Sequence, residues 1–178
     1  MDFEEPGWPL IDNFFVRLAE GRKAETVRRY ARVRLRLYDF LDVDDMIEWL
    51  GPDDATLLAA EREFLRDGAV WTVFGLGGVL RCLPGFLTEA QLPTSGAEAR
   101  MQVSVVSRFV TDLRNRHLVP REDVHALLVA RRAAMRARDR LQLEQKLRAA
   151  GPDSGLHRAI AEIDRVHERF RQQPGPQW

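Results

Sequence analysis

The stretch from Ala24 to Leu41, AETVRRYARVRLRLYDFL, constrains the fold most, because at helical spacing it separates into an apolar side and a cationic side. The apolar side chains recur every three or four residues and are Val27, Tyr30, Val33, Leu37 and Leu41. On the opposite side lie Arg28, Arg29, Arg32 and Arg36. Arg34 falls on the apolar side, so we expect its guanidinium group to reach outward past its neighbours. The pattern predicts a helix with one side in a core and a basic side free for another partner.

Charge is segregated along the chain, although 27 basic residues balance 27 acidic ones. Arg22 to Tyr38 holds seven basic residues against one acid, Asp39 to Asp67 holds ten acids against two basic residues, and Arg121 to Arg148 holds eight basic residues against four acids. The zero net charge argues against a uniformly positive surface and leaves room for separate basic and acidic faces.

Other helical patterns fill most of the chain, and strand patterns are nearly absent. The predicted helices are Trp8–Glu20, a short turn at Met46–Leu50, Ala55–Arg66 with Asp53 or Asp54 as its cap, Ala97–Leu118, Glu122–Ala149, and a last helix capped by Ser154. The apolar stretch Val70–Leu83 fits a buried helix ended by Pro84-Gly85, or a pair of strands. We predict an all-α protein with about six to seven helices: a helical domain over residues 1–120, and a C-terminal helical extension over 121–178 that packs on it or on a partner.

Within the longest predicted helix, small and apolar residues form a narrow seam at alternating spacings of three and four. They are Leu127, Ala130, Ala134, Ala137 and Leu141. Such a seam is typical of a helix that packs against another helix. Arg132, Arg136 and Arg140 line one edge of the same helix.

No catalytic or metal-binding pattern is visible in the sequence. The four histidines lack metal-ligand spacings, and no nucleophile lies in a recognisable motif with a base, so we expect no enzyme, no metal and no cofactor. Cys82 is the only cysteine, which excludes an intramolecular disulfide. The apolar run Ala69–Leu83 is short, rich in glycine and interrupted by Arg81, and the N-terminus lacks a signal pattern. We therefore expect a cytoplasmic protein that does not span a membrane.

Two segments resemble the N-terminal core-binding (SAM-like) domain of tyrosine recombinases, the phage integrase family. The first is FFVRLAEGRKAETVRRYARVRLRLYDFL, Phe14–Leu41, and the second is RMQVSVVSRFVTDLRNRHLVP, Arg100–Pro120. The resemblance implies a helical module that grips duplex DNA, with DNA-facing positions at Arg22, Lys23, Thr26, Arg28, Arg29 and Arg32. The chain departs from the family in having no His-x-x-Arg motif and no separate catalytic domain, so strand cleavage is not expected.

Two functions from different classes follow from these patterns. The first is a non-catalytic module that binds duplex DNA through phosphate contacts. Its predicted site comprises Arg22, Lys23, Thr26, Arg28, Arg29, Arg32, Arg36, Arg132, Arg136 and Arg140. The second is a helical protein–protein interaction or structural module without nucleic acid, with a homodimer or a helical protein as partner. In it, the Arg131–Arg140 helix and the acidic Asp39–Asp67 region pair with each other, within one chain or across a dimer. The first hypothesis requires that the chain's own carboxylates do not neutralise the arginines.

Overall fold

The computed structural model describes residues 9–43, 46–65 and 67–150, and every regular element in these ranges is helical. The elements are α1 (Pro9–Ala19), α2 (Ala24–Val43), α3 (Ile47–Leu50), α4 (Pro52–Arg62), α5 (Ala69–Phe86), α6 (Gly96–Asn115), the short 3₁₀ helix η1 (Arg121–Asp123) and α7 (Val124–Ala150). The prediction of an all-α fold is confirmed. The predicted helix after Ser154 lies outside the described residues.

The chain divides into two compact units, one ending at Arg138 and the other beginning at Asp139, so the division falls within α7. The first unit holds α1 to α6, η1 and the first half of α7. The described part of the second unit is the remainder of α7.

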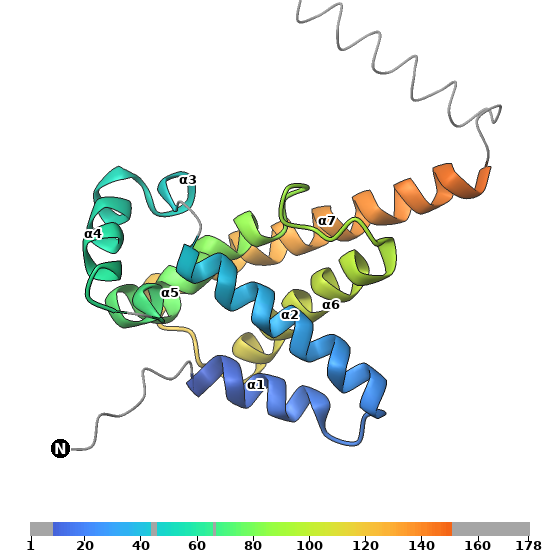
Figure 1. The fold of residues 1–178 in the computed structure, drawn as a ribbon, viewed down its shortest axis with the longest axis horizontal. Helices are drawn as coiled ribbons and strands as arrows, with labels where there is room; N and C mark the ends of the chain where they lie inside the picture. The colour runs from blue at the N-terminus through green and yellow to red at the C-terminus, as the bar shows by residue number, and fades with distance from the viewer. Residues whose placement is uncertain (1–8, 44–45, 66, 151–178) are drawn as a thin grey trace, which may run out of the picture. The chain divides into compact units, whose positions relative to one another are not determined.

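The core of the first unit forms around α2 and α5. Helix α2 packs on α1, α5 and α6, while α5 also contacts α3 and α4 (Figure 1). Aromatic rings join these helices, since the Phe14 ring lies 5.1 Å from that of Phe109, and the Phe40 ring lies 5.5 Å from that of Phe86. The apolar side predicted for α2 is buried at Tyr30, Val33, Leu37 and Leu41, whereas Val27 is half-buried.

The ambiguous apolar stretch is helix α5, and most of its residues are buried. Gly75 interrupts the helix with φ 58° and ψ −150°, a conformation open almost only to glycine, so α5 is kinked there. By length and composition alone α5 could cross a membrane, a test that a buried core helix also passes.

Four predicted helix ends are wrong by three residues or more. Helix α4 ends at Arg62 and not at Arg66, and α6 ends at Asn115 and not at Leu118. Helix α5 does not end before Pro84 but continues to Phe86, because its last turn closes through the N–H groups of Leu87 and Thr88 on the carbonyls of Pro84 and Gly85. Helix α4 begins at Pro52, and Gly51 occupies the N-cap. Proline is well suited to a first helical position because its missing N–H needs no partner there.

The seam predicted in α7 is buried at Leu127, Ala130, Ala134 and Ala137.

Helices α5 and η1 approach closely at Gly77. A Cβ atom added at this glycine would lie 2.2 Å from Oδ1 of Asp123. The small residues of both segments therefore serve packing within the described chain.

Candidate nucleic-acid interface

At the start of α2, basic side chains are exposed and have no carboxylate partner among the described residues. Arg22 and Lys23 lie in the turn between α1 and α2, and Arg28 lies one turn into the helix; all three are exposed. Among the described residues, none of the three forms an ion pair. The carbonyl of Lys23 accepts the N–H of Val27, so the helix begins here and directs the amides of its first turn outward. Helix N-termini attract anions for this reason.

The remaining arginines predicted on α2 are paired with carboxylates of the same chain. Arg29 pairs with Glu25, one turn away on the same helix. Arg32 and Arg36 both pair with Glu98 of α6, at 3.4 and 3.5 Å. The requirement that the arginines be unneutralised is therefore met at the start of α2 and only in part farther along.

These paired arginines surround a pocket of about 220 Å³ between α2 and the first turn of α6. Its lining consists of Arg29, Arg32, Val33, Arg36, Ser95, Ala97, Glu98 and Met101. Ser95 precedes α6 as its N-cap residue, but its side chain makes no capping hydrogen bond. Three guanidinium groups thus share the pocket with one carboxylate, which leaves the local charge positive.

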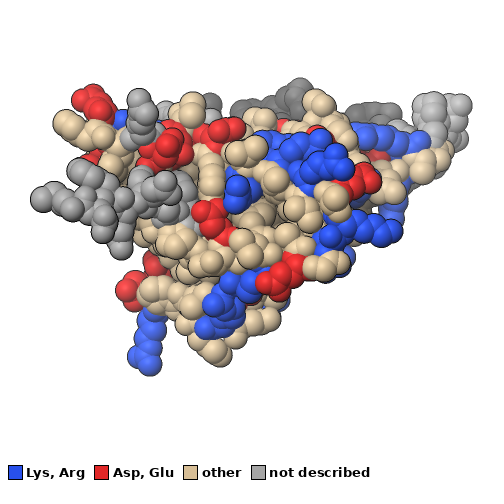
Figure 2. Space-filling view, turned by 60° about the horizontal axis from the view of Figure 1, so that its bottom comes forward, with Lys and Arg blue, Asp and Glu red and all other residues tan. Residues whose placement is uncertain are grey.

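The other predicted residues lie apart from this pocket. Thr26 is half-buried in the first turn of α2. Arg132 and Arg136 are exposed on α7, and neither lines the pocket nor, among the described residues, forms an ion pair. Arg140 lies in the second unit and pairs with Glu144 at 4.0 Å. Figure 2 shows basic side chains in several groups with carboxylates between them, so this face is not uniformly positive.

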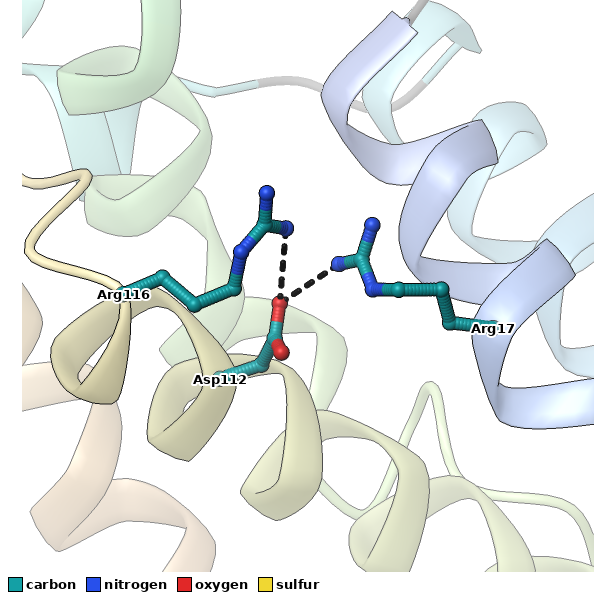
Figure 3. Close-up of polar contacts among 3 residues, drawn as sticks. All are labelled: Arg17, Asp112 and Arg116. Atoms are coloured by element: carbon teal, nitrogen blue, oxygen red, sulfur yellow. Dashed lines mark hydrogen bonds and ion pairs between the residues drawn. The ribbon is translucent and has the colours of Figure 1, made fainter.

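A second carboxylate that holds two arginines lies at the other end of α6. Asp112 accepts a hydrogen bond from Nη2 of Arg17 at 2.7 Å, and Nη1 of Arg116 lies 3.5 Å from the same oxygen, Oδ2 (Figure 3). Arg17 comes from α1, so this contact joins two helices. Asp112 and Glu98 therefore use the same arrangement: one carboxylate of α6 binds two arginines.

Sequence reasoning missed three residues at this surface. Glu98 and Ser95 complete the pocket, and Arg108 of α6 donates a hydrogen bond to the Tyr30 hydroxyl at 3.2 Å. The only sequence signal for Glu98 is its place in the first turn of a predicted helix, where an acid is favoured by the helix dipole. That signal does not reveal which arginines the carboxylate meets.

Three other titratable groups have perturbed pKa values because they are buried. Burial raises the pKa of the Cys82 thiol to about 12, so it stays protonated near neutral pH and is a poor nucleophile. Burial and the hydrogen bond to Asp12 raise the pKa of Tyr38 above its usual value. Burial also raises the pKa of Asp42. The N–H of Gly68 donates a hydrogen bond to the Asp42 carboxylate, which lowers this pKa, but the effect of burial is larger. None of the three groups lines the pocket beside α2.

Within residues 9–43, 46–65 and 67–150, no group of three or more His, Cys, Asp or Glu side chains could hold a metal ion. The chain matches no protein-family model, no curated protein and no solved structure.

Proposed function

We propose that this protein is a non-catalytic helical module that binds the phosphate backbone of duplex DNA through the start of α2. The observation that carries the proposal is the exposure of Arg22, Lys23 and Arg28, which have no carboxylate partner among the described residues and lie beside the open amides of the first turn of α2. Lysine, arginine and helix N-termini are the groups that proteins use most to contact phosphate.

The dimensions of the basic row also support this proposal. At ~1.5 Å per residue, the row from Arg22 to Arg36 extends about 20 Å, the length of several phosphates along one DNA strand. Its six basic residues, Arg22, Lys23, Arg28, Arg29, Arg32 and Arg36, face only two carboxylates, Glu25 and Glu98. The resemblance of Phe14–Leu41 to the core-binding domain of tyrosine recombinases implies DNA contact at five of these six residues, all except Arg36.

Fluorescence anisotropy with a labelled random-sequence duplex tests the proposal. We expect Arg28→Glu to weaken binding at least about tenfold and to lower the slope of log affinity against log salt by about 1 or more, because the substitution removes one phosphate contact and adds repulsion.

The matched control is Arg121→Glu, which makes the same charge change at an exposed residue of another element, η1. Its affinity should stay within about twofold of the wild type at equal salt, since a screened charge on another element contributes little. If both variants lose the same affinity for DNA, the weaker binding reflects net charge and not a contact of Arg28. A wild-type protein that fails to bind DNA at low salt would overturn the proposal.

A further inference from the structure

Helix α7 carries apolar side chains on two different sides. One side is the seam already described, which is buried. On another side, Val124, Leu128 and Met135 are 43%, 45% and 56% exposed. Their spacings of four and seven residues place them in one row along the helix, which we call the α7 stripe. The solvent-facing side of a helix in a monomeric protein is normally polar. The α7 stripe is therefore an exposed apolar surface of the kind that binds a partner.

Arginines border the α7 stripe. At 100° per residue, Arg131 and Arg138 lie along one edge and Arg132 along the other. All three are exposed, and in the described part of the chain none forms an ion pair. The surface is therefore apolar along its middle and cationic at its margins, an arrangement that suits an apolar partner with acidic margins.

Helix α4 and the turn after it present a surface with that complementary character. Leu57 is 46% exposed and Phe64 is 81% exposed, the largest value among the exposed large hydrophobic side chains of the described chain. The two residues are seven apart, and the N–H of Phe64 still donates to the carbonyl of Glu61, so Phe64 continues the helical path. We call Leu57 and Phe64, with the exposed Ala60 between them, the α4 stripe.

Carboxylates border the α4 stripe as arginines border the α7 stripe. Glu61 and Glu63 lie on its two sides, and Asp53 lies one turn before Leu57. None of the three forms an ion pair among the described residues. By contrast, Asp54 points to α5 and accepts a hydrogen bond from Arg81 at 2.7 Å. The acids at the stripe are thus the ones that the fold leaves without a cation.

We propose that the α7 stripe of one copy of this chain docks on the α4 stripe of a second copy. Both stripes are apolar along the middle, and their margins have opposite charge. This inference goes beyond nucleic-acid binding and does not depend on it, because the residues involved are separate from the start of α2. Each copy carries both stripes, so two reciprocal contacts would close a symmetric dimer. The stripes are short, which predicts a transient interface with a Kd of about 1–100 µM.

Sedimentation velocity of the full chain tests this, with two charge-reversal variants. One variant is Arg131→Glu/Arg132→Glu on α7, and the other is Glu61→Arg/Glu63→Arg on α4. The wild type should sediment above its monomer mass of 20.5 kDa as concentration rises, and less so in high salt. Each variant alone should associate at least about tenfold more weakly, because each places like charges on both stripes.

An equimolar mixture of the two variants distinguishes the proposed contact from any other. In the mixture, the acidic α7 of one variant meets the basic α4 of the other, and the remaining contact is of wild-type kind. Association should therefore return to within a few-fold of the wild type. Circular dichroism verifies that each variant is folded. Arg100→Glu/Arg148→Glu makes the same charge change at exposed residues outside both stripes and should associate like the wild type.

Three outcomes would overturn the proposal. The wild type could remain a monomer up to ~0.1 mM, which is the upper end of the expected Kd. The single variants could associate as strongly as the wild type, which would assign self-association to another surface. The mixture could stay monomeric, which would mean that a different protein or residues 151–178 of the same chain cover the stripes.

Discussion

Gly85 is a residue at which the absence of a side chain matters for the core. It is buried in the last turn of α5, and a Cβ atom there would lie 2.4 Å from Nε1 and 2.6 Å from Cε2 of Trp49. The indole ring of the short helix α3 therefore rests directly on the backbone of α5. The ring is large and rigid, so a methyl group at Gly85 would have to displace the whole indole.

Gly85→Ala should consequently destabilise the protein by about 1–3 kcal/mol, even though alanine favours a helix by up to ~1 kcal/mol over glycine. The measurement is urea unfolding followed by circular dichroism and by tryptophan fluorescence. Gly77→Ala is the matched comparison, because its Cβ would meet the carboxylate of Asp123, the far end of a side chain that can rotate. We expect a smaller loss at Gly77, and a Gly85→Ala protein as stable as the wild type would show that Trp49 does not pack there.

At the scale of elements, helix α1 is held by ion pairs on both sides of its apolar face. Asp12 accepts a hydrogen bond from the Tyr38 hydroxyl at 2.5 Å and pairs with Arg34 of α2 at 3.2 Å. On the other side, Arg17 binds Asp112 of α6. The short α1 thus gains orientation from polar contacts in addition to the burial of Ile11 and its two phenylalanines.

Arg17→Ala and Arg116→Ala separate the contact between helices from the contact within one helix. Arg17 joins α1 to α6 at 2.7 Å, so its loss should lower the free energy of unfolding by about 1 kcal/mol. Arg116 pairs with Asp112 one turn away in the same helix at 3.5 Å, and its loss should cost less than about 0.5 kcal/mol. Urea midpoints compare the two variants directly, and equal losses would contradict a role for Asp112 in docking α1.

The sequence predicted most helices because periodicity reports which side of a helix is buried. The buried side of α2 follows from the spacing of Tyr30, Val33 and Leu37 alone. Periodicity could not decide the nature of α5, since a segment buried on nearly all sides has no polar face to reveal its period. The kink at Gly75 and the continuation past Pro84 depend on backbone angles and on hydrogen bonds of the last turn, which composition does not specify.

For the whole molecule, the sequence gives the local charge of each segment but not the partners of that charge. It placed Arg32 and Arg36 on the basic side of α2, where they are. It could not predict that Glu98 lies between them, because that contact depends on how α6 crosses α2 in three dimensions. The arginines without carboxylate partners are accordingly fewer than the sequence suggested, and an interface can form only where pairing is incomplete.

Glu98 should therefore limit the affinity of α2 for a polyanion, given the proposed DNA binding. In the folded chain its carboxylate is the shared partner of Arg32 and Arg36, and a phosphate group would have to compete with it for the same guanidinium groups. Glu98→Gln removes that competition and raises the local charge by one. We expect several-fold tighter binding to the random duplex and a slope of log affinity against log salt that is steeper by about 1.

The matched control is Glu122→Gln, the same change at an exposed residue of η1, which should leave the affinity and the salt slope within about twofold of the wild type. If the two variants bind alike, Arg32 and Arg36 do not contact phosphate, and the interface is confined to Arg22, Lys23 and Arg28 at the start of α2.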